Sequence, residues 1–325
     1  MKFLRLITSA GLTVGASALF VVPQAEAASW APQSNSGVKY QTCSNSRSYK
    51  SVAYVTCIQH SSGFAKARVV IRVSATAKRS ASGSPYLKIG SHKSAPKCSG
   101  TLAKGAKKQC ATAWLSAPHA VEIGTGTITI AGSTRPALRL RGMHFSGNKQ
   151  ENAEKYCGPA SVQAALLTMG AGSPSQSTLA SKLGTNTYGF TPPNKIAPVL
   201  NSYKPAAVGK YHLYDFGPSG QSVVVAFRQL WRSLDAGQPV VYLVDPSKLP
   251  WSSAPGSSVR HYIELHSYVA VRSTTDQNLT GGWLVDHFQA FDPASGTIHN
   301  ITPLQLQKAS TTSDYVDDDL VFVSK

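Results

Sequence analysis

Five cysteines divide this 325-residue chain into two parts. Cys43, Cys57, Cys98 and Cys110 form two couples that are close in sequence, and Cys157 is left over. In an exported protein an even set of cysteines usually pairs, whereas an odd one is a free thiol or an intermolecular link. We therefore predict the disulfides Cys43–Cys57 and Cys98–Cys110, while spacing alone leaves the two other connectivities open.

The first 27 residues predict that the chain is exported. Lys2 and Arg5 precede a short apolar stretch, and Ala25-Glu26-Ala27 fits a small-x-small cleavage site. This is the pattern of a secretory signal peptide, and the polar residues that interrupt the apolar stretch argue against a membrane anchor. We expect a secreted, extracellular monomer without a membrane span, able to associate with a cell wall.

Charge is distributed very unevenly along the chain. Residues 28–148 contain seventeen Lys and Arg and a single acid, Glu122, whereas residues 149–325 contain thirteen of each sign. Such asymmetry predicts two domains with different partners. A basic surface attracts polyanions, so the expected partner of the first domain is an anionic cell-wall polymer or an acidic polysaccharide. The region lacks the motifs of nucleic-acid-binding domains, so no specific nucleic acid is expected.

The residue pattern predicts an all-β domain over residues 28–140. Short β-branched runs, among them SVAYVTCI (51–58), ARVVIRVSA (67–75) and GTITIA (126–131), alternate with Gly-, Ser- and Pro-rich segments. Such spacing is typical of a β-sandwich or a small barrel. The two disulfides would close short loops in this weakly cored region and stabilise it by about 2–4 kcal/mol each.

Residues 141–325 predict a second domain of the α+β class. Helical patterns occur at 157–170, 173–184, 191–203 and 222–237. Strand patterns then follow at 239–245, 266–273, 282–292 and 319–324. Helices followed by strands in this order indicate helices packed on an antiparallel sheet.

Cys157 precedes Gly158-Pro159 at the start of the first predicted helix. A helix N-terminus favours an anion and so lowers the pKa of a thiol. A histidine on the facing sheet would complete a thiolate–imidazolium pair, and a carboxylate or amide would orient that histidine. The Cys157 N–H and the side-chain amide of Gln150 are candidates for an oxyanion hole. The alternatives are an intermolecular disulfide or an inert buried thiol.

The segment QENAEKYCGPASVQAALL resembles the nucleophile motif of the bacteriocin-processing (double-glycine leader) peptidase-like family of the papain clan. The following SQSTLASKLGTNTYGFTPPNKIAPVLN is also similar to that family, as are HSYVAV and FDPASG. The resemblance covers residues 145–325 and implies a papain-like fold and a cysteine peptidase acting on peptides without a cofactor. It implies Cys157 as the nucleophile and Gln150 as the oxyanion donor.

Two histidines fit the catalytic position, because His261 and His266 both precede alternating strand residues. Antiparallel pairing about a turn centred near residue 278 places 266 opposite about 290, close to Asp292. We therefore predict His266 as the catalytic histidine and Asp292 as the residue that orients it. His261 and Asp286 are the alternatives. No cluster has zinc-ligand spacing, so neither a metal nor a cofactor is expected.

These observations favour a secreted cysteine peptidase that cleaves peptide or amide bonds and is tethered to an anionic surface by its basic domain. A wall-peptide amidase or an acyl transferase would use the same residues. The alternative from a different class is a non-catalytic protein that binds a cell wall or polyanion through a degenerate peptidase scaffold.

Overall fold

The computed structural model describes residues 28–310 except 39, 45, 62–65, 90, 117–120, 144, 173, 215–222, 253–259 and 273–282. The predicted signal peptide and the predicted strand at 319–324 lie outside the described residues. In the described part of the chain, no helix combines the length and the apolar composition needed to cross a membrane.

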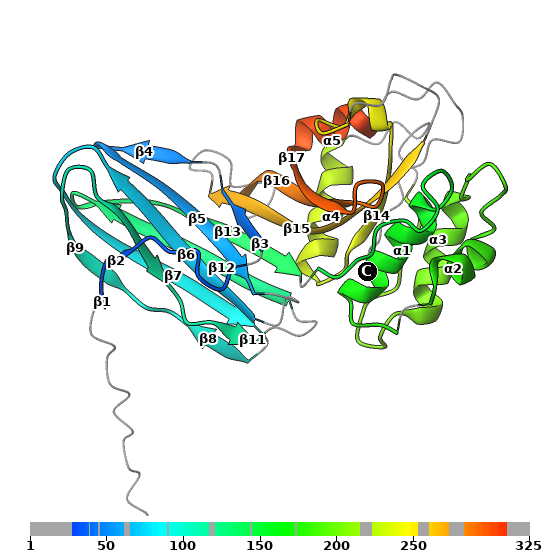
Figure 1. The fold of residues 1–325 in the computed structure, drawn as a ribbon, viewed down its shortest axis with the longest axis horizontal. Coiled ribbons are helices and arrows are strands. Elements are labelled where there is room, and N and C mark those ends of the chain that lie inside the picture. Colours follow the sequence, from blue (N-terminus) through cyan, green and yellow to red (C-terminus); the bar gives the residue numbers. More distant parts are fainter. Residues whose placement is uncertain are drawn as a thin grey trace, which may run out of the picture.

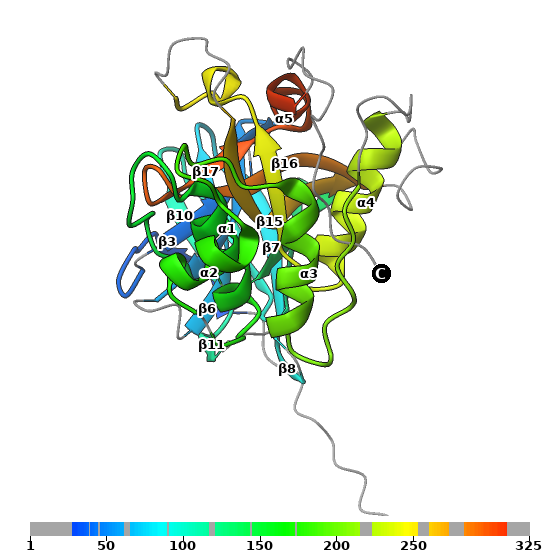
Figure 2. The same ribbon diagram turned by 90° about the vertical axis from the view of Figure 1, so that its right-hand side faces the viewer.

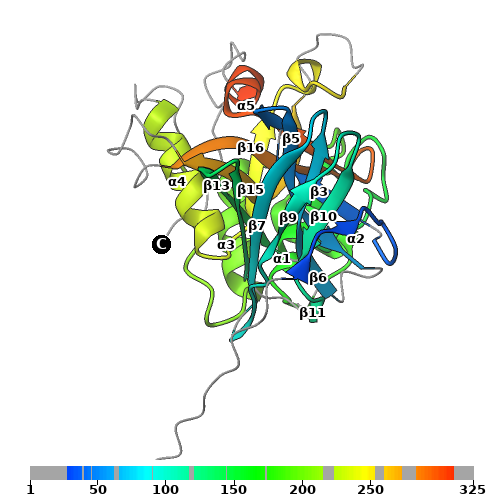
Figure 3. The same cartoon turned by 90° about the vertical axis from the view of Figure 1, so that its left-hand side faces the viewer.

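The N-terminal half consists of two open, largely antiparallel sheets that face each other (Figures 1 and 3). One sheet has the order β2-β10-β6-β5-β3, with β11 on β6 and β4 on β5. The other begins β1-β9-β7-β12-β13, with β8 on β7. The strands are β1 (Ala28–Ser29), β2 (Ala31–Pro32), β3 (Tyr40–Cys43), β4 (Arg47–Tyr49), β5 (Val52–His60), β6 (Lys66–Ala75), β7 (Arg79–Ile89), β8 (His92–Ser94), β9 (Cys98–Leu102), β10 (Lys107–Ala111), β11 (Leu115–Ser116), β12 (Val121–Ile130) and β13 (Ser133–Met143).

The two sheets bury an apolar layer between them. Ile71 and Val73 of β6 meet Ile128 and Ile130 of β12 in one cluster. At Gly126 the sheets approach so closely that a Cβ atom would lie 2.8 Å from the Thr56 Oγ1, which leaves room only for glycine. Of the two architectures that the sequence predicted, the described strands therefore form a sandwich and no closed barrel.

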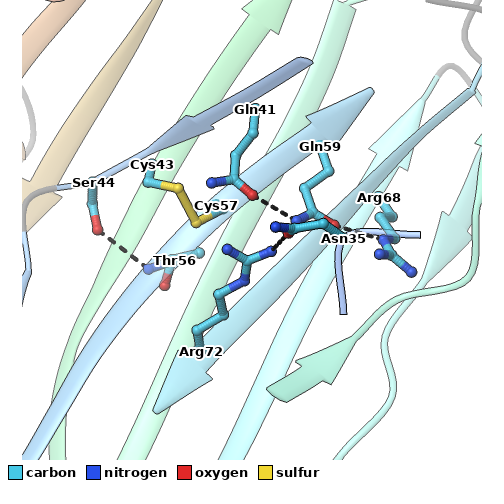
Figure 4. Close-up of a disulfide and its surroundings, with 9 residues drawn as sticks. All are labelled: Asn35, Gln41, Cys43, Ser44, Thr56, Cys57, Gln59, Arg68 and Arg72. Atoms are coloured by element: carbon cyan, nitrogen blue, oxygen red, sulfur yellow. Dashed lines mark hydrogen bonds between the residues drawn. A yellow bond between two sulfur atoms is a disulfide. The ribbon is translucent and has the colours of Figure 1, made fainter. Parts of the chain in front are cut away.

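Both predicted disulfides are confirmed. Cys43–Cys57 joins the neighbouring strands β3 and β5 (Figure 4). Cys98–Cys110 joins β9 of one sheet to β10 of the other, so it fastens the sandwich across its core. Cys157 carries a free thiol.

The C-terminal half begins with helices, as the sequence predicted. Ser175 caps α2 by accepting a hydrogen bond from the Thr178 N–H, and Gly184 ends that helix with a left-handed backbone. The elements are α1 (Cys157–Thr168), α2 (Gln176–Leu183), α3 (Pro193–Tyr203), α4 (Val223–Asp235), β14 (Val240–Val244), the 3-10 helix η2 (Pro246–Lys248), β15 (His261–Arg272), β16 (Trp283–Asp292), β17 (Thr297–Ile301) and α5 (Pro303–Ser310).

Strands β14–β17 lie between two groups of helices (Figure 2). Val241 and Tyr262 pack in one cluster with α1, α2 and α3. Tyr242 and Ile263, their neighbours in sequence, pack with α4 and α5. This alternation buries both faces of the sheet and holds the start of α1 over the start of β15.

One sheet runs across the boundary predicted between residues 140 and 141. Strand β13 pairs with β12 on one side and with β15 on the other (Figure 1). Asp235, at the end of α4, forms ion pairs with Arg139 at 3.2 Å and with Arg141 at 3.0 Å, both on β13. It also accepts a hydrogen bond from Tyr268. The domain boundary stays a prediction, and the structure joins the two halves through a shared sheet.

Candidate active site

Cys157 is the first residue of α1, so its thiol lies where the helix dipole is positive. Tyr156 precedes the helix and makes no side-chain cap, which leaves the N–H groups of the first turn without a side-chain acceptor from that residue. The following glycine is required by packing, because a Cβ atom on Gly158 would lie 2.5 Å from the Thr191 Oγ1. Only glycine after Cys157 therefore allows Thr191, in the loop before α3, to pack this close to the start of α1.

The partly buried thiol of Cys157 is hydrogen-bonded to the ring of His261. Burial on its own raises the pKa of Cys157. The hydrogen bond and positive charge of His261, together with the backbone N–H groups of Tyr262 and Gly158, outweigh burial and lower that pKa. The site therefore stabilises the thiolate, the nucleophilic form of cysteine, more than an ordinary thiol environment does.

His261 is held from its other side by Asp292. Its Nε2 lies 2.8 Å from the Asp292 Oδ1, so Nδ1 is the ring nitrogen left for the thiol. Burial lowers the pKa of His261, but Asp292 and Cys157 raise it to about 9. Asp292 in turn accepts hydrogen bonds from the Trp251 Nε1 and the Ala294 N–H, both at 2.9 Å. Although burial opposes this, His261 and these donors lower the pKa of Asp292 to about 2.

The structure brings His261 to Cys157 and Asp292, and it places the predicted His266 elsewhere. The His266 Nδ1 lies 2.9 Å from the Glu264 Oε2. The His266 ring lies 4.7 Å from the ring of Phe145, centroid to centroid. Glu264 is fully buried and His266 is 2% exposed, so this second histidine–carboxylate pair is sealed inside the protein.

A β-bulge separates the two histidines. Glu264 pairs with Phe291 and Leu265 with Ala290, but the register then shifts, and Ser267 pairs with Gln289. His266 is the extra residue at this shift, whereas the sequence-based register placed it directly opposite 290. A displacement of one residue turns a side chain to the opposite face of a sheet.

The faces of the sheet follow from these pairings. The Phe145 ring packs at a tilt against both His266 and Phe291, which places this histidine on the face of Phe291. Asp292 follows Phe291 in the strand and therefore points to the other face. His261 lies two residues before Ile263 and therefore points to the same face of the sheet. Ile263 packs in one cluster with Ala290, and Asp292 lies two residues after Ala290. His261 and Asp292 thus point to the same face.

Gln150 lies beside the segment that carries Asp292. Its backbone N–H donates to the Pro293 carbonyl at 2.9 Å, next to Asp292. Its Nε2 donates one hydrogen to the Ala153 carbonyl, and its buried Oε1 makes no hydrogen bond within the described residues. The alternative carboxylate, Asp286, instead lies beside His287, with its Oδ2 at 3.2 Å from the His287 Nδ1.

Three residues at the site were not foreseen from the sequence. Trp251 holds Asp292, Tyr262 gives its N–H to the thiol, and Thr191 packs on Gly158. The Tyr262 Oη donates to the Thr191 carbonyl at 2.9 Å and so ties the loop before α3 to the strand of His261. The isolated tryptophan in KLPWSS, an unusual residue for a polar connection, is the one signal by which the sequence could have drawn attention to Trp251.

The arrangement provides a nucleophile, an acid–base group and an orienting carboxylate in one hydrogen-bonded line. Among the described residues, no group of three or more His, Cys, Asp or Glu side chains is placed to hold a metal ion. A search of curated proteins and a search of solved structures each gave no match. The model of the Peptidase_C39 like family matches residues 144–312, which contain Cys157, His261 and Asp292. This match covers more than half of the sequence and confirms the resemblance to papain-clan cysteine peptidases, and the chain therefore belongs to the Peptidase_C39 like family.

Proposed function

We propose that this chain is a secreted cysteine peptidase that hydrolyses peptide or amide bonds. The observation that supports it best is the line Cys157–His261–Asp292, with the thiol at a helix N-terminus. The proposal gives His261 the role that the sequence analysis assigned to His266. It keeps Cys157, Asp292 and Gln150 in their expected roles.

In the proposed reaction the Cys157 thiolate attacks the carbonyl carbon of the scissile bond. The developing oxyanion accepts hydrogen bonds from the Cys157 N–H and from the second amide hydrogen of Gln150. The imidazolium of His261 gives its Nδ1 proton to the leaving amine, which departs and leaves a thioester. His261 then removes a proton from a water molecule, and the resulting hydroxide releases the acid product and regenerates the thiol pair. Asp292 keeps the ring oriented throughout.

Substitution of Cys157 tests this proposal. Wild type and Cys157→Ala are treated with iodoacetamide at pH 6, where an ordinary thiol is mostly protonated. We expect rapid labelling of the wild type alone, and cleavage of a casein or peptide mixture by the wild type alone. Equal labelling of the two proteins contradicts a reactive Cys157. Labelling without cleavage of peptides or of cross-linked wall fragments favours the non-catalytic alternative.

We further propose that the basic sandwich binds an anionic polymer through β6. Arg68 and Arg72 lie on one face of this strand (Figure 4). The Arg68 Nε donates to the Gln59 Oε1 at 2.7 Å, its guanidinium lies 4.5 Å from the centre of the Trp114 ring, and Arg72 donates to Asn35. Neutral groups thus orient both guanidiniums.

This pair of arginines has no acidic neighbour in the sequence around it, because Glu122 is the only acid between residues 28 and 150. Burial and, after it, the like charge of Arg72 lower the pKa of Arg68. The Arg68 Nη2 and the Arg72 Nε are buried and make no hydrogen bond within the described residues. A phosphate or carboxylate group of a polymer, bound at the exposed part of the two guanidiniums, would relieve this repulsion.

Binding to immobilised polyphosphate and polygalacturonate tests the polymer site and separates phosphate from carboxylate recognition. The variant Arg68→Gln/Arg72→Gln is compared with Lys88→Gln/Lys93→Gln. The control removes the same charge from a cross-strand pair of exposed lysines on β7 and β8, in the other sheet. We expect the arginine variant to elute at clearly lower salt than the control. Equal losses would show that only overall charge matters.

A further inference from the structure

Two exposed aromatic side chains stand next to the candidate active site. Tyr188 is 91% exposed and Phe190 is 51% exposed. They are two of four large hydrophobic residues that are exposed in the described part of the chain, and the other two, Leu284 and Leu304, lie far from them in sequence. A pair of exposed aromatics in one short loop is a feature typical of a recognition surface.

Internal hydrogen bonds define the shape of this loop. The Asn186 Oδ1 accepts from the Tyr188 N–H at 2.9 Å and from the Phe190 N–H at 3.0 Å. The Asn186 N–H donates to the Phe190 carbonyl at 3.0 Å, and the Gly189 N–H donates to the Asn186 carbonyl at the same distance. The aromatic pair is therefore presented to solvent by an ordered turn, which reduces the entropy lost when a ligand binds.

Packing fixes the loop against the residues that carry the proposed chemistry. Gly189 has a left-handed φ of +87°, and a Cβ atom there would lie 2.8 Å from the Glu154 carbonyl oxygen, just before Cys157. Thr191 packs on Gly158, directly after Cys157. The Thr191 carbonyl accepts from Tyr262, the neighbour of His261. Both the nucleophile and the histidine are thus bordered by the segment that holds Tyr188 and Phe190.

We propose that Tyr188 and Phe190 form a specificity site that binds an apolar or aromatic side chain of a peptide substrate near its scissile bond. This inference rests on the proposed peptidase function and names its substrate class. An extended peptide across Cys157 places side chains about 3.3 Å of backbone apart, so a residue close to the scissile bond reaches the neighbouring loop. Burial of an apolar side chain against two rings supplies preference for that residue over glycine.

Binding by a protein that cannot cleave separates this inference from the catalytic proposal. Cys157→Ala is titrated with Ala–Gly hexapeptides in which one residue at a time is Phe, Leu or Gly. We expect tighter binding of the Phe and Leu peptides at one position. Adding Tyr188→Ser or Phe190→Ser should weaken that binding about tenfold. Adding Leu304→Ser, which removes another exposed apolar side chain, on α5, should leave it unchanged.

Cleavage of the same peptides by otherwise wild-type protein gives the second readout. The aromatic variants should lose about tenfold in kcat/KM on Phe and Leu peptides, while the rate of iodoacetamide labelling of Cys157 stays the same. The inference is overturned if the aromatic variants bind and cleave peptides like Leu304→Ser. It is also overturned if the loop of Tyr188 and Phe190 binds sugar chains in place of peptides. Selective binding without cleavage by the wild type would instead contradict only the peptidase proposal.

Discussion

Strand β15 carries the histidines of two buried histidine–carboxylate pairs, which look alike but have different surroundings. His261 meets Asp292 at the start of the strand, beside the thiol of Cys157 and the N-terminus of α1. His266 meets Glu264 five residues further on, where Phe145 covers the ring. The side chain of His261 is 11% exposed, and that of His266 is 2% exposed.

The two pairs show that the same histidine–carboxylate contact occurs in very different surroundings. At the first pair, burial opposes ionisation, but the hydrogen bond and charge of His261, with smaller contributions from Trp251 and a backbone N–H, lower the pKa of Asp292 to about 2. At the second pair, burial raises the pKa of Glu264, and its Oε1 makes no hydrogen bond in the described part of the protein. We therefore propose the first pair for proton transfer, whereas the second is part of the core beneath α1.

The largest expected effect is on activity. Replacement His261→Gln should lower kcat/KM for peptide cleavage by about 1,000-fold or more, because the thiolate loses its ion-pair partner and the leaving amine its acid. The matched change His266→Gln, which keeps a hydrogen-bonding group beside Glu264, should change kcat/KM by less than about tenfold. Rates are normalised to the fraction of folded protein. A greater loss in His266→Gln would reverse the assignment.

The second effect is on stability, and here a change in the His266–Glu264 pair should have the larger effect. Glu264→Ala leaves a hole and an unpaired histidine in the core, which should cost about 3–5 kcal/mol of unfolding free energy. Asp292→Ala should cost less, about 1–2 kcal/mol, because its partners lie near the surface of the site. Urea unfolding at pH 7 measures both values. If the Asp292 variant proved the less stable of the two, the distinction between a functional and a structural pair would fail.

The features predicted correctly from sequence are those set by local chemistry. Cys157 stands next to Gly158-Pro159 and a helical pattern, so its place at a helix N-terminus required no knowledge of distant residues. The two disulfides join cysteines that are 14 and 12 residues apart, and this closeness in sequence favoured the correct pairing although it left the two other connectivities open. In the same way the helical pattern at 173–184 contains α2.

The features that escaped prediction depend on tertiary contacts. The bulge at His266 shifts the register by one residue, and nothing in HYIELHSY marks where an extra residue is inserted. Charge and pattern both change near residue 140, yet β13 pairs with β15 across that point. The contact of Trp251 with Asp292 spans 41 residues and follows no periodic pattern. Local propensity carries no information on such pairings.

A third and smaller effect concerns pH. The proposed active form needs a Cys157 thiolate and a His261 imidazolium. Because the pKa of Cys157 is lowered, activity should persist on the acid side and fall when the thiolate becomes protonated. Because the pKa of His261 is raised to about 9, activity should be lost as the pH rises through about 9. The pH dependence of kcat/KM measures both limits. Asp292→Asn removes a contact that raises the pKa of His261, so the alkaline limb of this pH profile should move to lower pH. Glu264→Gln should not move it.

The smallest effect tests the support of Asp292 by Trp251. In Trp251→Phe an aromatic ring remains to stack on His299, which lies 4.3 Å away between ring centres, but the hydrogen bond to the Asp292 Oδ2 is lost. A hydrogen bond of this kind contributes about 1 kcal/mol, so kcat/KM should fall about fivefold. The carboxylate would also gain protons more readily, and the alkaline limb should shift slightly downward. Phe145→Leu, beside the sealed pair, should leave that limb in place, and an equal shift in both variants would show that the two pairs are coupled through β15.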